Sequence, residues 1–210
     1  MDKFTFVTGQ HGNEPIPVFA LSSKNIPQVI ANPRALALGK RFLDCDLNSS
    51  FNAKSNKYYE HRRAKELLDV ISPKTIIIDL HTFSADSEPF VVIVDKKMVK
   101  LARQTGLKHI VLMEHNIKND CALINHRNGI SVEVGKHNDY KSFLMTLKII
   151  DNINSGEKKN KEAIIYSVFD IIRKPGDYVN FKKNKDGFVP ILAGEKAYDF
   201  YGLKAKRIKL

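Results

Sequence analysis

The feature that most constrains the fold of this chain is a series of short apolar runs, separated by segments with helical spacing. The runs are rich in β-branched and aromatic residues and predict strands at Phe4–Thr8, Thr75–Leu80, Phe90–Val94, His109–Met113 and Ile130–Val134. Runs that are apolar at consecutive positions are typical of a sheet covered on both faces. Because these strands alternate with helices, we expect an α/β domain.

Helices lie between the predicted strands, and the pattern changes near residue 156. Apolar spacing predicts helices over Tyr58–Ile71, Lys97–Thr105 and Asp139–Ile153. Farther along, turns rich in Gly, Asn and Pro flank further predicted strands at Ala163–Ile172 and Gly187–Leu192. We therefore expect a main domain over residues 1–155 and a small β-rich C-terminal domain over residues 156–210.

The composition excludes several classes of protein. With 210 residues, 43% of them hydrophobic and 27% charged, the chain can bury a core and is not a disordered chain. Its longest apolar stretch, residues 89–94, is far shorter than the ~20 residues of a membrane-spanning helix. The N-terminus alternates apolar and polar residues, unlike a signal peptide, and Cys45 and Cys121 are too few for a disulfide framework. We expect a soluble cytoplasmic protein with no membrane partner.

The formal net charge of +11 raises the question of nucleic-acid binding. Much of the positive charge in the C-terminal part lies in mixed runs, such as residues 157–162 and 182–186, which are typical of solvated loops. Nucleic-acid grooves usually interleave aromatic and basic residues, and this chain shows no such segment. We therefore expect a small-molecule substrate and no nucleic acid, and we leave open whether the chain forms a homo-oligomer.

Two polar pairs next to predicted strands have the chemistry of metal ligands. His11 and Glu14 follow the first strand, and a spacing of three residues lets both side chains converge on one point. A later apolar strand ends in Asp79-Leu-His81, so His81 can supply a third ligand. Asp79 can orient a ligand by a hydrogen bond without contacting the metal itself. Two imidazoles and one carboxylate form the ligand set of a catalytic zinc. Taken singly, each pair also suits a surface turn or an ordinary hydrogen-bonded histidine.

A carboxylate in the middle of an apolar strand is a candidate catalytic base. Glu133 lies in the run Ile130–Val134, and a buried carboxylate is costly unless it is paired or functional. Metal-assisted hydrolysis needs a base that takes the proton of the attacking water, and a desolvated Glu suits this task. The alternative is an edge strand in which Glu133 faces water.

The polar segment Lys40–Asn48 has no clear period, which is typical of a binding loop. Arg41 is a candidate for stabilising an oxyanion, and Asn48 is a candidate for orienting a substrate by hydrogen bonds. The alternative is an ordinary surface loop in which Arg41 pairs with Asp44 or Asp46.

Together and in this order, these motifs resemble the aspartoacylase/succinylglutamate desuccinylase family of zinc carboxypeptidase-like hydrolases. The segments that carry the resemblance are Gly9–Glu14, Asn32-Pro-Arg-Ala35, Arg41–Asn48, Asp79-Leu-His81 and Val132-Glu-Val-Gly135. The resemblance spans about residues 4 to 137. It implies a zinc carboxypeptidase-like mixed β-sheet flanked by helices, with the catalytic domain in residues 1–155.

The resemblance also implies a role for each matched residue, and one zinc ion per chain. The matched positions are His11, Glu14 and His81 as zinc ligands, Glu133 as general acid/base, Arg41 for polarising the scissile carbonyl and Asn48 for contacting the substrate. In the C-terminal part, Gly194-Glu-Lys-Ala-Tyr198 is similar to a family stretch whose Tyr reaches the substrate carboxylate. Tyr198 is therefore a further candidate, although a Tyr in a β-rich segment also suits packing.

Two positions depart from the family pattern. Aspartoacylases have Arg where this chain has Ser49 and Leu123, and His126 and Arg127 are the nearby candidates to replace them. The loss of two bidentate carboxylate contacts weakens recognition of a dianionic substrate such as N-acetylaspartate. We expect a zinc-dependent deacylase for an N-acylated amino acid or a related small amide. A carboxypeptidase-type peptidase and a catalytically silent relative that binds an anionic ligand remain the alternatives.

Overall fold

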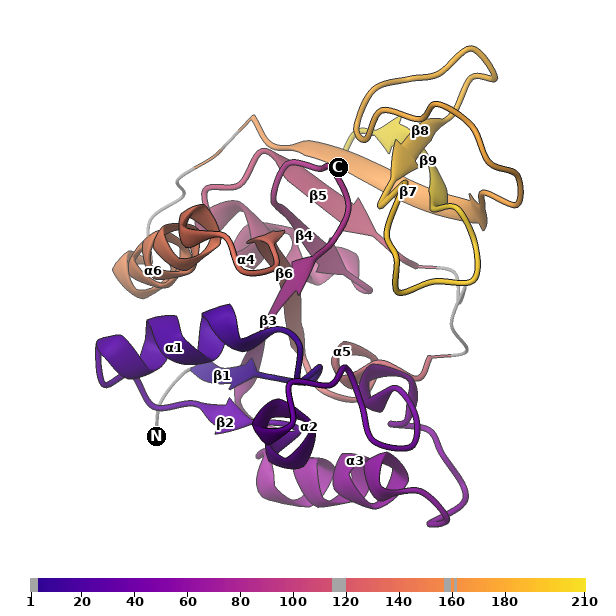
Figure 1. The fold of residues 1–210 in the computed structure, drawn as a ribbon. Helices are drawn as coiled ribbons and strands as arrows, with labels where there is room; N and C mark the ends of the chain where they lie inside the picture. Colours follow the sequence, from indigo (N-terminus) through magenta and orange to yellow (C-terminus); the bar gives the residue numbers. More distant parts are fainter. Residues whose placement is uncertain (1–3, 115–119, 157–159, 161) are drawn as a thin grey trace.

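The computed structural model describes residues 4–114, 120–156, 160 and 162–210, whose strands form one nine-stranded sheet (Figure 1). The strands are β1 (Phe4–Thr8), β2 (Val29–Ile30), β3 (Ile76–Phe83), β4 (Phe90–Ile93), β5 (His109–Leu112), β6 (Gly129–Lys136), β7 (Ile164–Ile171), β8 (Val189–Ile191) and β9 (Leu203–Ile208). The helices are α1 (Pro15–Ser23), α2 (Pro33–Ala37), α3 (Tyr59–Val70), α4 (Val99–Gln104), α5 (Leu123–His126) and α6 (Tyr140–Ser155), with 3₁₀ turns η1 (Leu47–Ser49) and η2 (Lys96–Met98). The mixed α/β architecture confirms the predicted fold class.

The sheet combines parallel and antiparallel pairs. Its strand order is β2-β1-β3-β6-β4-β5-β7-β9-β8. Strand β6 runs parallel to β3 and antiparallel to β4, and β9 runs antiparallel to both β7 and β8. Strand β7 pairs in parallel with β5, so the sheet continues across residue 156. The division into domains at residues 155 and 156 stays a prediction.

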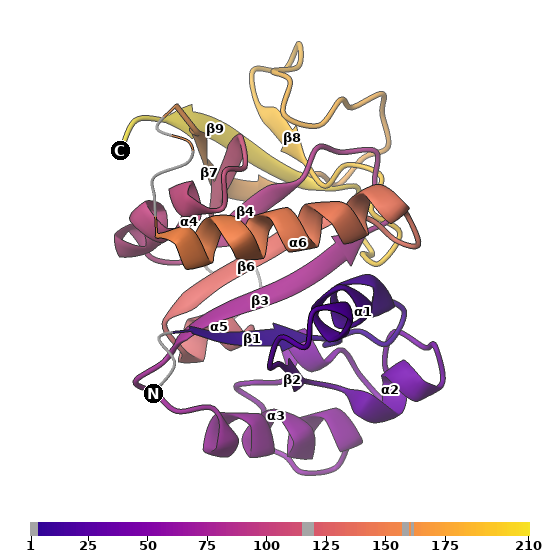
Figure 2. The same cartoon turned by 90° about the vertical axis from the view of Figure 1, so that its left-hand side faces the viewer.

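Helices cover both faces of the sheet, as the consecutive apolar runs predict. Helices α1, α4 and α6 bury Leu21, Ala102 and Ile150 against one face, and α1 and α6 lie side by side (Figure 2). Helices α3 and α5 bury Leu67 and Leu123 against the opposite face. None of the described helices is long and apolar enough to cross a membrane.

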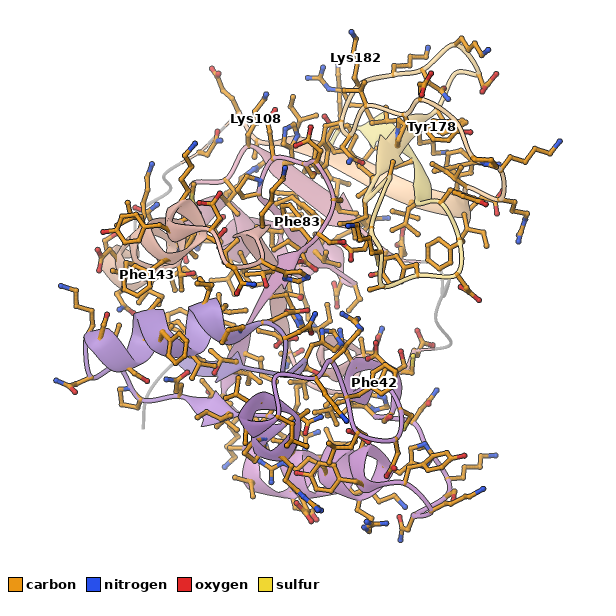
Figure 3. The ribbon with its side chains drawn as sticks, viewed as in Figure 1. Phe42, Phe83, Lys108, Phe143, Tyr178 and Lys182 are labelled. Carbon is orange, nitrogen blue, oxygen red and sulfur yellow. The ribbon has the colours of Figure 1, made fainter. Side chains whose placement is uncertain are left out.

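A further apolar cluster joins the end of β3 to the C-terminal strands. Phe83, which lies near the centre of the molecule in Figure 3, packs against Phe90 with a distance of 6.0 Å between ring centroids. The same cluster includes Leu192 and Leu203 from the C-terminal part. This packing brings the segment after β8 against the end of β3, next to the polar residues described below.

Candidate metal centre and cavity

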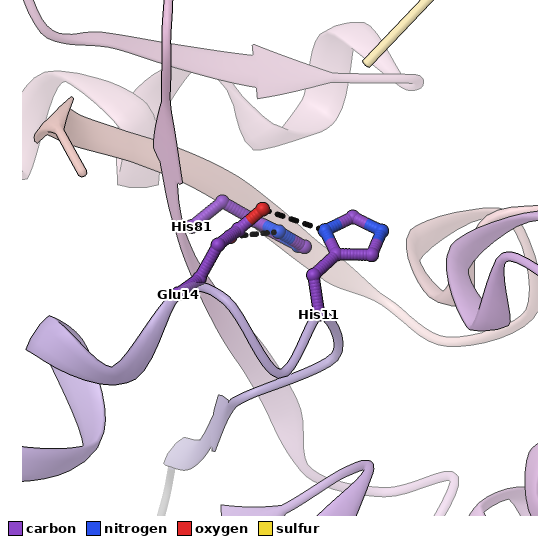
Figure 4. Close-up of side chains that lie close together, drawn as sticks. All are labelled: His11, Glu14 and His81. Atoms are coloured by element: carbon purple, nitrogen blue, oxygen red, sulfur yellow. Dashed lines mark hydrogen bonds and ion pairs between the residues drawn. The ribbon is translucent and has the colours of Figure 1, made fainter. Parts of the chain in front are cut away.

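The three predicted metal ligands come together where β1 and β3 end. His11 and Glu14 lie in the turn between β1 and α1, and His81 lies in β3, the parallel neighbour of β1. One ligand atom from each residue lies within 4.8 Å of the others, and all three residues are buried (Figure 4). The carboxylate of Glu14 faces both rings, with 2.7 Å to Nδ1 of His11 and 3.1 Å to Nδ1 of His81.

The opposite nitrogen of each ring is held by an aspartate. Nε2 of His11 lies 3.1 Å from Oδ1 of Asp46, and Nε2 of His81 lies 2.9 Å from Oδ2 of Asp79. A neutral imidazole that donates from Nε2 keeps its lone pair on Nδ1, the atom that faces Glu14. Two lone pairs and one carboxylate therefore converge, which is the donor chemistry that a zinc ion requires.

Electrostatics in this cluster favour bound protons on the imidazoles. Burial would raise the pKa of Glu14, but the charges and hydrogen bonds of His11 and His81 hold it well below its ordinary value. Burial would lower the pKa of His81, yet Asp79 and Glu14 hold it well above its ordinary value. A metal ion has to displace these protons, so we expect metal affinity to fall as the pH falls.

Glu133 lies beside this cluster because of strand register. It pairs with His81 across the β3–β6 ladder, and β6 lies between β3 and β4 in the interior of the sheet. The edge-strand alternative is therefore wrong. Its Oε2 atom is shielded from solvent and has no hydrogen-bond partner among the described residues. Burial raises the pKa of Glu133 to about 8, with His81 acting against the shift and Glu14 and Glu195 adding to it.

Arg41 and Asn48 both reach the same cavity. Nη2 of Arg41 donates to Oδ2 of Asp46 at 2.9 Å, and Nη1 donates to Oε1 of Glu14 at 3.5 Å. The pairing with Asp46 was one of the alternatives above, and it coexists with a place beside the metal ligands. Nε of Arg41 is buried without a partner among the described residues, so a donor stays free for another acceptor. Asn48 accepts a bond from the backbone N–H of Leu123 at 3.4 Å.

The cavity beside the cluster is small and combines both parts of the chain. Its volume of ≈ 30 Å³ suffices for a water molecule or two. The lining residues are His11, Glu14, Arg41, Asn48, His81, Thr82, Phe83, Glu133, Leu192, Glu195, Ala197 and Tyr198. Tyr198 thus reaches the cavity with the other candidates, and its ring stacks on Phe200 at 4.7 Å between centroids.

Glu195 holds the C-terminal wall of the cavity in place, a contact that the sequence reasoning missed. Its carboxylate accepts bonds from the backbone N–H and the hydroxyl of Ser84, each at 2.8 Å. The backbone N–H of Lys196 in turn donates to the Ser84 hydroxyl at 2.9 Å. Glu195 stands inside the segment Gly194–Tyr198, but a partner 111 residues away leaves no mark in the sequence pattern.

The structure does not bring Arg127 to the cavity. Its guanidinium donates to backbone carbonyls near the C-terminal end of α3, namely those of Ile71 and Leu68, and to the carbonyl of His126. These contacts satisfy carbonyls that a helix end leaves without partners. His126 also turns elsewhere, since its Nε2 donates to the backbone oxygen of Asp120 at 2.9 Å.

The chain matches a family model over most of its length. Residues 2–156 match the model of the Succinylglutamate desuccinylase/Aspartoacylase catalytic domain. A protein of Prochlorococcus marinus named "Probable aspartoacylase" is 34% identical over 140 residues, which cover 56% of this chain and 48% of the relative. A protein of the same name from Trichodesmium erythraeum is 25% identical over 229 residues, covering 89% and 76%. The chain spans about half the length, or less, of the first curated relatives it matches.

Solved structures share the fold. Murine aminoacylase 3 has a TM-score of 0.77 and 20% identity, covering 99% of this chain and 96% of that one. The succinylglutamate desuccinylase from Chromobacterium violaceum has a TM-score of 0.76 and 17% identity, covering 100% and 85%. At these identities the likeness supports a common fold, and the chemistry has to be argued from the side chains.

Proposed function

The chain belongs to the succinylglutamate desuccinylase/aspartoacylase family, and from this membership we propose that it is a zinc-dependent amide hydrolase. Its substrate in this proposal is an N-acylated amino acid or a related small amide. The observation that carries the proposal is the buried cluster of His11, Glu14 and His81, with the shielded carboxylate of Glu133 on the neighbouring strand. These are the groups that hydrolysis of an unactivated amide requires in one place.

In this proposal His11, Glu14 and His81 would hold the metal, and Asp46 and Asp79 orient the two imidazoles. A divalent ion at this position would polarise the scissile carbonyl and make the attacking water more acidic. The same ligand set also accepts divalent ions other than zinc, so the choice of zinc rests on the family resemblance.

Glu133 acts as the general acid/base. Its unpartnered Oε2 takes the proton of the attacking water and then delivers it to the nitrogen of the leaving amine. In the metal-free protein the pKa of Glu133 is raised to about 8. A cation held by His11, Glu14 and His81 would favour the carboxylate form of Glu133, which is the form that accepts a proton.

Arg41 stabilises the negative charge that develops on the carbonyl oxygen. Its Nε–H, which has no partner among the residues that the structure describes, supplies a donor, while Asp46 and Glu14 hold the rest of the guanidinium. Asn48 and Tyr198 line the cavity and orient the substrate by hydrogen bonds. Arg127 has no part in this proposal, because its guanidinium is engaged at the end of α3.

The cavity favours a substrate with little negative charge. Arg41 is the one Lys or Arg side chain in the lining named above, and it already faces two carboxylates. Leu123, which stands where aspartoacylases have Arg, is buried in the apolar cluster beneath α3. We therefore expect N-acyl amino acids with a neutral side chain to be hydrolysed faster than dianionic ones such as N-acetylaspartate.

The variant Glu133→Gln tests the proposal. We expect turnover to fall by about 10²- to 10⁴-fold, because the general base is lost, while zinc content measured by elemental analysis stays the same. Full activity of this variant would remove Glu133 from the mechanism. A panel of N-acyl amino acids and short peptides separates a deacylase from a carboxypeptidase-type peptidase. Absence of hydrolysis together with tight binding of an anionic ligand would favour the silent relative.

A further inference from the structure

A buried carboxylate that the proposed mechanism does not use lies outside the cavity. Glu60, in the first turn of α3, has no exposed surface (0%). Its carboxylate accepts bonds from the backbone N–H groups of Leu43 (2.7 Å), Asp44 (3.1 Å) and Cys45 (3.2 Å), and from Nδ2 of Asn32 (3.2 Å). Consecutive backbone N–H groups that point at one carboxylate form an anion-binding nest, filled here by a side chain of the same molecule.

The contact between α3 and this loop is reciprocal. The carboxylate of Asp44 accepts a bond from the backbone N–H of Tyr59 at 2.8 Å, at the start of α3. The N-terminal turn of a helix carries a partial positive charge, which favours a carboxylate at Glu60. Charge-assisted bonds of this kind are stronger than neutral ones. Helix α3 and the loop are therefore held together by two carboxylates, that of Glu60 on the helix and that of Asp44 on the loop.

The locked loop carries the groups that act at the metal centre. Arg41 precedes the nest, and Asp46 follows it directly. Asp46 holds Nε2 of His11 at 3.1 Å and Nη2 of Arg41 at 2.9 Å. A shift of the nest by a few tenths of an ångström would move both of these contacts, because Asp46 is bonded directly to Cys45, the last residue of the nest.

Glu60 also supports the turn that carries His11. The side chain of Asn32 donates to Glu60, and its backbone N–H donates to the backbone oxygen of Gly9 at 2.9 Å. Asn32 therefore links Glu60 to the start of this turn. The backbone N–H of Gly12 donates to the oxygen of Arg41 at 3.1 Å. A Cβ atom at Gly12 would lie 2.1 Å from the backbone carbon of Ala35, so the turn that carries His11 packs against the backbone of α2, which begins directly after Asn32.

We propose that Glu60 is a positioning residue for the reaction: its carboxylate holds the loop that orients His11 through Asp46 and that presents Arg41 to the scissile carbonyl. This inference rests on the proposed function for the role of Arg41. The role of Glu60 toward the metal ligand His11 stands on the contacts alone. Replacing one carboxylate oxygen by an amide NH₂ places a donor against backbone donors, so Glu60→Gln loosens the nest while it keeps the size of the side chain.

The primary test compares Glu60→Gln with Glu66→Gln, a matched control on the same helix. The Glu66 side chain is 60% exposed and pairs only with Arg63 among the contacts described. For Glu60→Gln we expect zinc affinity, measured by competition with a chromophoric chelator, to fall by about 10-fold, as for other groups that orient metal ligands. We also expect kcat to fall by about 10-fold or more, with KM changed less than kcat. Glu66→Gln should leave all three values unchanged.

A double-mutant cycle separates positioning from a general effect on folding. If Glu60 acts through Asp46, the variant that combines Glu60→Gln with Asp46→Asn loses little more zinc affinity than Asp46→Asn alone. Losses that multiply would overturn the proposal, as would wild-type zinc affinity and kcat in folded Glu60→Gln. If Glu60→Gln does not fold, Glu60→Asp is the second variant, because it keeps the charge but is one methylene shorter. We expect it to lose zinc affinity to a similar extent while its far-ultraviolet circular dichroism spectrum stays the same as that of wild type. If wild type hydrolyses no amide, the proposed function fails while the zinc measurements still decide the role of Glu60.

Discussion

Two loops line the cavity, and each is anchored by one glutamate: Glu60 of α3 holds the first loop from outside it, whereas Glu195 lies within the second loop. Glu60 is fully buried and receives three backbone N–H groups of the loop that carries Arg41 and Asp46. Glu195 is half-buried and ties its own loop to Ser84. The first loop lies within the segment matched by the family model, as do His81 and Glu133, and we call these parts of the lining the first wall. The second loop lies outside that segment and forms the second wall. Under the proposed function, we expect the first wall to supply the reaction chemistry and the second wall to shape substrate binding.

The strongest test of this division removes a metal ligand from the first wall. Replacing His81 by Ala takes away one of three ligand atoms and leaves Asp79 without its imidazole partner. We expect bound zinc, measured by elemental analysis after dialysis, to fall from one ion per chain to a small fraction, and hydrolysis to fall with it. Unchanged zinc stoichiometry would remove His81 from the ligand set. The exposed variant Glu66→Gln serves as the control.

The next effect concerns Glu133 in the first wall and the way in which the free energy of unfolding of the protein changes with pH. The pKa of Glu133 is raised to about 8 in the metal-free fold, so the folded state keeps a proton that the unfolded state releases near its ordinary value. The contribution of Glu133 to the free energy of unfolding is therefore highest at low pH. It declines as the pH rises from the ordinary value of 4.5 to about 8, with a slope of up to about 1.4 kcal/mol per pH unit.

Urea unfolding of protein treated with a chelator, measured from pH 5 to pH 8, checks this slope. His11 and His81 also have raised pKa values, so their contributions decline with rising pH as well. The difference between wild type and Glu133→Gln isolates the contribution of Glu133, because Gln does not titrate. A pH dependence that is the same in both proteins would contradict the raised pKa of Glu133.

A smaller effect is expected from the second wall. In Glu195→Gln one acceptor oxygen becomes a donor, so a bond from Ser84 is lost and the segment that carries Tyr198 loosens. We expect KM to rise about 5-fold, which corresponds to one hydrogen bond of about 1 kcal/mol, with zinc affinity and kcat close to wild type. A variant whose kcat and zinc affinity fall while KM stays constant would break the comparison between the two walls.

The smallest effect on the reaction is expected at Arg127. Replacing it by Gln removes bonds to the carbonyls at the end of α3, so the protein should lose about 1 kcal/mol of stability, seen as a lower Tm. Its KM and kcat should not change, because the side chain does not line the cavity. A rise in KM without a loss of Tm would restore Arg127 as a substrate-binding residue.

Much of the fold could be predicted because several strands are marked in the sequence by short runs of β-branched and aromatic residues. Strands β1, β4 and β5 occur at nearly the predicted residues, since burial on both faces of the sheet favours the β-branched and aromatic side chains that mark these runs. Strand β9 was not predicted. Its lysines alternate with the buried residues Leu203 and Ala205, and such a short alternating segment becomes a strand only through pairing with β7 and β8.

Contacts in the site could also be predicted from spacing only where the residues lie close together in the sequence. His11 and Glu14 could be predicted because both ligands lie within one short motif. Asp79 could be predicted as a supporting carboxylate because it lies two residues from His81. Asp46 and Glu195 could not be predicted in this role, because Asp46 lies 35 residues from His11 and Glu195 lies 111 residues from Ser84. The prediction for Arg127 rests on its nearness along the chain to Leu123, where the family has Arg. The direction of its side chain is decided instead by unpaired carbonyls at a helix end, which the sequence does not reveal.

The parallel pairing of β7 with β5 has a consequence for how the molecule is made. On the ribosome, the proposed metal ligands and Glu133 are all synthesised before β7, yet the outer edge of β5 stays unpaired until Ser167 has emerged. An open parallel edge of apolar residues is prone to associate with other nascent chains. A transcript truncated near residue 156 would therefore yield aggregates in place of a smaller working catalyst, even though it encodes every ligand of the metal.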